Sequence, residues 1–135
     1  MLVDERGGPL GAVIAGANVH DCKLLEATIE AVVVDRPDTV QRLGVDRGYD
    51  NPTGRCAAEA AGYRLYVQGS LGARGEGPGR PPKPRRWVVE RTLAWLSKCR
   101  GLLVRYEKHA ANCLGLIQLA CGLLWFRRLH RIGAA

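Results

Sequence analysis

The stretch QRLGVDRGYD, residues 41–50, decides how this chain can fold. Its first part, residues 41–46, is a candidate β-strand, and a turn is expected at 48–52. Asp46 would then leave the carboxyl end of a strand, at the sheet edge where sites of α/β proteins lie. The alternative is a turn aspartate that only accepts hydrogen bonds from nearby backbone N–H groups. The residues themselves leave both interpretations open.

Strand and helix signals alternate on both sides of this stretch. Upstream, residues 3–15 suggest two strands joined by a glycine turn, and a helix is expected to start at Asp21, with one face of residues at three- and four-residue spacing (Leu24, Leu25, Thr28, Ile29 and Val32). Downstream, Asn51 is a suitable N-cap, Pro52 a suitable first helical residue, and Gly62 a suitable helix end. A further strand is expected at 63–67, a helix at 87–100 stopped by Gly101, and a last helix at 107–129. Strands interleaved with helices predict a single α/β domain over residues 1–135.

The charge of the chain is unevenly distributed. Residues 1–60 hold six basic and ten acidic residues, whereas residues 61–135 hold fourteen basic and only three acidic ones. A strongly basic half favours a polyanionic partner, of which nucleic acid is the commonest. A merely solvated basic face remains the alternative.

Residues 69–85 form a segment rich in glycine, proline and basic residues. Such a composition cannot build a core, so a flexible loop is expected there. It is either a linker within the domain or a basic loop that becomes ordered on DNA.

Five cysteines occur without any C-x-x-C pair or zinc-type spacing, which indicates free thiols in a reducing cytoplasm. No signal-peptide pattern follows Met1. The longest apolar stretch, near residues 113–126, contains Gly115, Gln118 and Gly122. We expect a buried helix there and no membrane span, because a span needs about 20 apolar residues.

The segment RRWVVERTLAWL, residues 85–96, places Glu90 on the expected helix. Glu90 is one of the three acids in the basic half. An ordinary exposed ion pair with Arg86, four residues earlier, would explain it without any function.

Taken together, residues 46–50 and 85–96 resemble the DDE transposases of bacterial insertion sequences, specifically the insertion-sequence-five group. The resemblance implies that Asp46 is the second catalytic aspartate and Glu90 the catalytic glutamate, both ligands of Mg²⁺ or Mn²⁺. Residues 16–21, 105–108 and 127–129 add lesser matches, so the resemblance covers nearly the whole chain. It implies an α/β, ribonuclease H-like fold, in which a mixed sheet is flanked by helices.

The chain departs from the family pattern at two places. The first catalytic aspartate of the family lies on a central strand before the hairpin, whereas Met1 already falls at the hairpin. Asp4 and Asp21 do not match that motif, so the expected fold is incomplete and lacks its first central strand. The basic residue expected two turns after the glutamate is replaced by Ser97, with Lys98 one step later.

The resemblance implies Mg²⁺-assisted phosphodiester hydrolysis and strand transfer at the ends of an insertion sequence. Several acids must converge on one point, because Mg²⁺ prefers carboxylate and water oxygens. The phosphates next to the scissile one need Arg or Lys side chains, which supply affinity and register. Tyr49 could donate a hydrogen bond to a phosphate or stack on a DNA base. Alternatively, it is a packing residue at the end of the strand. The candidate DNA-binding residues are Arg47, Tyr49, Arg85, Arg86, Arg91 and Lys98.

Without the first aspartate, the chain alone is expected to be inactive and to expose strand edges. It would become active on joining an upstream transposase segment; a truncated remnant or a misplaced start codon is the alternative. Expected partners are double-stranded DNA at transposon ends and targets, an upstream segment or a homodimer. The rival interpretations are a non-catalytic DNA-binding fragment that regulates the full-length transposase, and a structural protein without DNA affinity.

Overall fold

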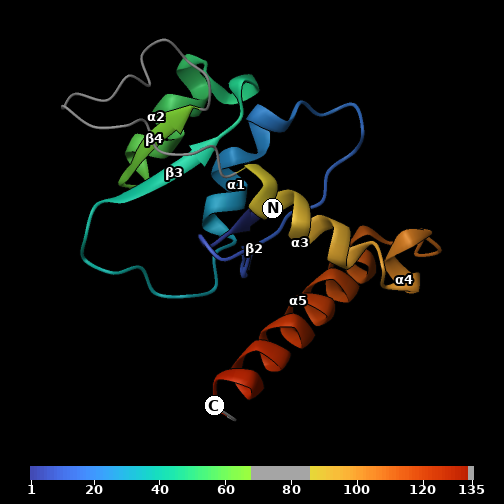
Figure 1. Ribbon diagram of the computed structural model, residues 1–135. Helices are drawn as coiled ribbons and strands as arrows, with labels where there is room; N and C mark the ends of the chain where they lie inside the picture. The colour runs from blue at the N-terminus through green and yellow to red at the C-terminus, as the bar shows by residue number, and fades with distance from the viewer. Residues whose placement is uncertain (68–85, 134–135) are drawn as a thin grey trace.

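A computed structural model describes residues 1–67 and 86–133 of the chain. Strands and helices are interspersed up to β4 and three described helices follow it, so the predicted α/β class is confirmed (Figure 1). The expected loop at 69–85 lies outside the described residues. The elements in chain order are β1 (Leu2–Val3), β2 (Pro9–Gly11), the 3-10 helix η1 (Asp21–Leu24), α1 (Leu25–Glu30), β3 (Gln41–Val45), the 3-10 helix η2 (Arg47–Tyr49), α2 (Pro52–Ala60), β4 (Tyr63–Val67), α3 (Arg86–Leu96), α4 (Arg100–Leu103) and α5 (Ala110–Gly133).

The described strands form two separate sheets of two strands each, and no mixed sheet of the kind that the resemblance implies joins them. β1 and β2 are antiparallel, whereas β3 and β4 are parallel, with Gln41 opposite Tyr63 and Val45 opposite Val67. No described strand lies between the two pairs, so they do not join. Parallel pairing brings the carboxyl ends of β3 and β4 to one edge of their sheet.

Helix α2 is the crossover between the two parallel strands, and its ends are determined locally. The Asn51 side chain accepts a hydrogen bond of 2.8 Å from the Gly54 N–H, and Pro52 fills the first helical position, where no N–H is needed. Gly62 follows the helix with a φ of +73°, a conformation that glycine adopts without strain. These features confirm the predicted cap, start and stop.

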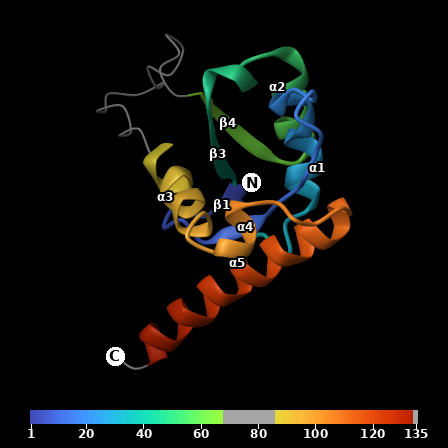
Figure 2. The ribbon, with the colours of Figure 1, turned by 90° about the vertical axis from the view of Figure 1, so that its right-hand side faces the viewer.

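The core lies between the parallel strands and the helices α1 and α2 (Figure 2). Leu25 and Ile29 point from α1 toward Leu43 of β3, Ala58 of α2 and Tyr63 of β4, and all five are buried. The three- and four-residue spacing in α1 creates this buried stripe, as the sequence predicts. The core therefore fixes β3, and with it the turn that begins at Asp46.

The turn between β1 and β2 is held closed by Asp4. One carboxylate oxygen of Asp4 accepts hydrogen bonds from the N–H groups of Arg6, at 2.8 Å, and Gly8, at 2.6 Å. Gly7 has a φ of +82°, and the Trp125 ring lies against Gly8 so closely that a β-carbon would collide with it. We call residues 4–9 the anchor turn.

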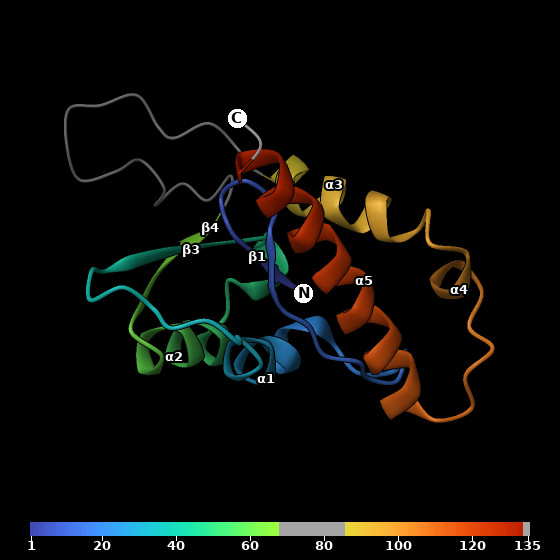
Figure 3. The same cartoon turned by 90° about the horizontal axis from the view of Figure 1, so that it is seen from below.

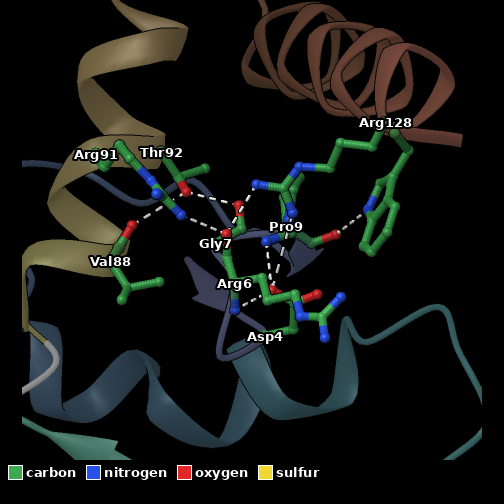
Figure 4. A network of polar contacts seen from close by, with 10 residues as sticks. Asp4, Arg6, Gly7, Pro9, Val88, Arg91, Thr92 and Arg128 are labelled. Carbon is green, nitrogen blue, oxygen red and sulfur yellow. Dashed lines mark hydrogen bonds and ion pairs between the residues drawn. The ribbon is translucent and has the colours of Figure 1, made fainter. Parts of the chain in front are cut away.

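Side chains from α3 and α5 donate hydrogen bonds to the carbonyl groups of the anchor turn (Figure 4). From α3, the Thr92 hydroxyl donates to the Gly7 carbonyl at 2.7 Å, and Arg91 donates to the Arg6 carbonyl. From α5, Arg128 donates to the same Arg6 carbonyl at 2.9 Å, and the Trp125 indole donates to the Pro9 carbonyl at 2.8 Å. These bonds join both helices to the hairpin, which is far from them in sequence. The polar residues concerned are Arg91, Thr92, Trp125 and Arg128.

The predicted end of the glutamate-bearing helix is wrong. α3 ends at Leu96 rather than at Arg100, and Gly101 lies inside the short helix α4 instead of stopping α3. The Ser97 hydroxyl donates to the Ala94 carbonyl at 2.9 Å, and Lys98 N–H bonds back only three residues, to Trp95. This local hydrogen bonding competes with continued helix, as serine often does.

The prediction of a buried last helix is also wrong. α5 runs from Ala110 to Gly133, and only one stripe, around Ala120 and Leu124, is buried (Figure 3). The anchor turn is too small to cover more of the helix. By length and composition alone, α5 is the one described helix that could cross a membrane.

Replacing Thr92 by valine tests the anchor turn, because valine keeps the shape and removes the hydroxyl. Thr92 is only 2% exposed, and we expect a loss of about 1–3 kcal/mol in the free energy of unfolding, since the Gly7 carbonyl loses its buried donor. Urea denaturation measures the change. The control, Thr53→Val on the exposed side of α2, should stay within about 0.5 kcal/mol. Equal effects of the two substitutions would contradict the role of the bond.

Candidate metal and nucleic-acid site

Asp46 lies immediately after β3, at the carboxyl edge of the parallel pair. It is the N-cap of η2, and its carboxylate accepts a hydrogen bond of 2.8 Å from the Arg47 N–H. This hydrogen bond to a backbone N–H is the one expected if Asp46 is a turn residue. The side chain is nevertheless exposed, so one carboxylate serves the turn and faces solvent at a sheet edge where ligands commonly bind.

Tyr49 is half-buried beside Asp46, and its surroundings reveal a second acid. Burial raises the pKa of Tyr49 above its ordinary value, and the negative charges of Asp21, Cys22 and Asp46 raise it further. The helices η1 and η2 are in contact, which brings Asp21 from the start of η1 to this edge. The sequence assigns Asp21 only to a helix start, and no local motif indicates its position near Asp46.

Asp50, the last residue of the same turn, has a different partner. Its carboxylate forms an ion pair with Arg55, on the first turns of α2. An exposed ion pair of this kind contributes little to stability. The ion pair ties the end of the turn to α2.

Glu90 lies on α3 and is exposed. Figures 1 and 2 show that α3 begins on the side of the molecule where β3 and β4 end. The next two residues along the helix, Arg91 and Thr92, bond to the anchor turn. The anchor turn therefore fixes the rotation of α3 and the direction in which Glu90 projects.

The basic residues predicted to contact DNA have different environments. Arg47 begins η2, beside Asp46, and Lys98 lies exposed in the turn after α3. Arg91 bonds to Arg6 and also stacks over the Trp87 ring, with 4.8 Å from its guanidinium carbon to the ring centroid. Trp87 is 54% exposed and therefore is not a core residue. Arg85 lies outside the described residues, and only the backbone of Arg86 is described.

The carboxylates in this region are ligands of the type that Mg²⁺ prefers, but they are too few to form a complete metal site. Exposed carboxylates are the ligands that this ion prefers. In residues 1–67 and 86–133, however, no three or more His, Cys, Asp or Glu side chains cluster closely enough to hold a metal ion. Asp46 and Glu90 are thus candidate ligands of a centre that needs further donors.

Sequence reasoning missed the polar residues that orient this region. Thr92, Trp125 and Arg128 all donate to the anchor turn. The Gly7-Gly8-Pro9 run indicates a tight turn with free carbonyl groups, but nothing in the pattern identifies their distant donors.

A tyrosinate titration tests the geometry around Tyr49. Because the folded-state pKa of Tyr49 is raised, its stabilising contribution is present below the ordinary value of about 10 and is lost as pH rises through the folded value. We expect Asp21→Asn to lower the pKa of Tyr49, and Asp46→Asn to lower it less.

The measurement is the ultraviolet difference absorbance between each variant and the same variant carrying Tyr49→Phe. Asp38→Asn, in the exposed segment before β3, is the control and should leave the titration unchanged. An unchanged titration in Asp21→Asn would mean that Asp21 does not lie at this edge.

Comparison with known proteins identifies one curated relative from Burkholderia cepacia, named "Putative transposase for insertion sequence element IS402". It is 34% identical over 140 aligned positions, which cover 97% of this chain. The chain spans 63% of the length of that relative. No family model and no solved structure matches the chain. The identity extends over nearly all of the residues described above, so the chain is similar to this insertion-sequence transposase along almost its whole length.

Proposed function

We propose that this chain supplies two of the three catalytic carboxylates of a DDE transposase, Asp46 and Glu90. The observation that carries the proposal is the arrangement of their elements. Asp46 leaves the carboxyl edge of the parallel pair, and α3, which carries Glu90, begins on the same side. The similarity to a transposase supports DNA transposition as the reaction to which this edge contributes.

The fold proposed for the complete protein is ribonuclease H-like. The β1–β2 hairpin and the parallel β3–β4 pair are its two halves, and a central strand from the remaining part of the protein joins them. That strand carries the third carboxylate. Such a strand would join the two separate sheets and add a carboxylate where the described residues hold no group of three metal-binding side chains.

The proposed cofactor is Mg²⁺ or Mn²⁺, held by the carboxylates of Asp46 and Glu90 together with that third group. When bound, the metal polarises the scissile phosphate and lowers the pKa of the attacking water. Within this chain, the Asp46 carboxylate is oriented by its bond to the Arg47 N–H. The orientation of Glu90 depends on the bonds between α3 and the anchor turn.

The proposed DNA contacts come from the basic residues around this edge. Arg47 and Lys98 are exposed and reach phosphates that flank the scissile one, where they supply affinity and register. The exposed Trp87 ring with Arg91 stacked on it offers a flat cationic surface of the kind that stacks on bases. The partner is double-stranded DNA at transposon ends and targets, and the protein acts in the bacterial cytoplasm.

A second candidate function is a non-catalytic DNA-binding fragment that competes with complete transposase. The observation favouring it is the charge of residues 61–135, where fourteen basic residues accompany three acids. DNA binding of this kind does not require the carboxylates of Asp46 or Glu90. The two functions therefore differ in what happens when these acids are neutralised.

The test compares Asp46→Asn and Glu90→Gln in a transposase extended to the full length of the relative. We expect each change to reduce Mg²⁺-dependent cleavage of DNA carrying insertion-sequence ends by at least about a hundredfold, because a lost ligand removes several kcal/mol of transition-state stabilisation. DNA affinity, measured by fluorescence anisotropy at several salt concentrations, should persist. The 135-residue chain alone should bind DNA and not cleave it.

The matched controls are Asp50→Asn, at the other end of the same turn, and Glu59→Gln, on the exposed face of α2. Both should cleave at close to the original rate. Full activity in Asp46→Asn or Glu90→Gln would refute the catalytic assignment. Binding without any cleavage by the extended protein would favour the regulator instead.

A further inference from the structure

Two arginine side chains from different helices converge on one carbonyl group of the anchor turn (Figure 4). Arg91 of α3 and Arg128 of α5 both donate to the Arg6 carbonyl, Arg128 at 2.9 Å. Since hydrogen bonds of this kind are about 3 Å long, the two donor nitrogens are at most about 6 Å apart. We call Arg91 and Arg128 the arginine clamp. Two like charges at this separation repel each other, so a negative group between them is stabilising.

Each member of the arginine clamp lies over the ring of a tryptophan. The guanidinium carbon of Arg91 is 4.8 Å from the Trp87 ring centroid, and that of Arg128 is 5.7 Å from the Trp125 ring centroid. Stacking of this kind fixes the plane of a guanidinium group and leaves its N–H edge available. The arginine clamp is therefore preorganised, and a ligand binds to it with little further loss of side-chain entropy.

Contacts within the described part of the chain use only a fraction of the donors of the arginine clamp. A guanidinium group has five N–H donors. In residues 1–67 and 86–133, Arg91 and Arg128 each donate one hydrogen bond, to the same carbonyl. A carboxylate oxygen of Asp4 lies 4.0 Å from an Arg128 nitrogen, but it already accepts from the N–H groups of Arg6 and Gly8. Arg91 is exposed and the Arg128 side chain is 29% exposed, so the remaining donors can reach a ligand.

We propose that the arginine clamp binds a phosphate group of the DNA backbone. A backbone phosphate carries a negative charge on its free oxygens, so the two guanidinium groups can donate to different oxygens of the same phosphate. The bonds to the Arg6 carbonyl persist, because each arginine has further donors. The inference rests on the function proposed above and adds Arg128, on α5, to the residues that contact DNA.

The position of the arginine clamp favours DNA over an acidic protein segment. Arg91 directly follows Glu90 on α3, so a duplex whose scissile phosphate reaches Glu90 carries neighbouring phosphates past the arginine clamp. Residues 61–135, which supply both arginines, contain fourteen basic and three acidic residues. The planar fork of a guanidinium group also matches the geometry of phosphate oxygens.

Fluorescence anisotropy of the 135-residue chain with labelled double-stranded DNA, over a range of salt concentrations, tests the proposal. We expect Arg91→Gln and Arg128→Gln each to weaken DNA binding about tenfold, because each removes a charge-assisted hydrogen bond to the phosphate. In each variant, the plot of the logarithm of the binding constant against the logarithm of the salt concentration should become shallower by about 0.9, the value for one phosphate contact.

Two control variants separate the arginine clamp from its surroundings. Arg131→Gln removes the same charge from an exposed position three residues further along α5. Thr92→Val removes a bond to the anchor turn and keeps both arginines. Each control should change the DNA affinity by less than about threefold. Arg128→Lys, which keeps the charge and loses the planar fork, should recover only part of the affinity lost in Arg128→Gln.

A double variant tests whether the two arginines hold one phosphate. If they do, combining Arg91→Gln with Arg128→Gln costs clearly less than the product of the two single losses, and the salt dependence changes by about one contact in total. Two independent phosphate contacts would give a loss of about a hundredfold and twice the change in salt dependence, which would contradict a shared phosphate. Circular dichroism of every variant establishes that it is folded.

Several outcomes would overturn the proposal. DNA binding that is indifferent to Arg91→Gln and Arg128→Gln refutes the arginine clamp alone, whereas no DNA binding by the original chain also contradicts the function proposed above. An equal loss of affinity in Thr92→Val would assign the effect to the fold of the anchor turn. Binding of a labelled polyglutamate peptide that requires both arginines, with DNA affinity unchanged in their variants, would assign the arginine clamp to an acidic protein partner instead.

Discussion

The buried hydrogen bond from the Thr92 hydroxyl to the Gly7 carbonyl is the contact on which the arrangement of this molecule depends. Asp4 closes the anchor turn from inside by accepting from the N–H groups of Arg6 and Gly8, which leaves the carbonyl groups directed outward. Donors from α3 and α5 satisfy those carbonyl groups. Each bond contributes only about 1 kcal/mol net, but an unpaired buried carbonyl would cost more. The turn therefore helps to orient both helices against the hairpin.

This arrangement links the hairpin to the proposed chemistry at the sheet edge. Asp46 is positioned by the core beneath β3, whereas Glu90 is positioned by the anchor turn through its neighbours on α3. The two carboxylates are thus positioned by different sets of contacts. In the proposed site, each ligand would stay in place only while both sets of contacts are intact, and the remaining part of the protein would complete the site.

Much of the fold was predictable from the sequence wherever local chemistry determines it. The Asn51 cap, Pro52 and the positive φ of Gly62 define α2, and the spacing in α1 defines the core stripe. Position 46 could also be assigned to a strand end. Distant pairings could not be predicted, because no local pattern encodes that Thr92 meets Gly7 or that Asp21 lies near Tyr49. The predicted burial of α5 failed for a similar reason, since composition does not show how much surface is available to cover a helix.

The most direct test of the account is iron-mediated cleavage of the protein, in which Fe²⁺ replaces Mg²⁺ and, with added hydrogen peroxide and ascorbate, generates hydroxyl radicals that cut the backbone next to the bound metal. If Asp46 and Glu90 hold one ion, the extended transposase should be cut near residue 46 and near residue 90 together. Excess Mg²⁺ should suppress both cuts in parallel, and Asp46→Asn should reduce both. Cutting near only one of the two positions, or cuts that respond differently to Mg²⁺, would contradict the claim that these carboxylates form a single site.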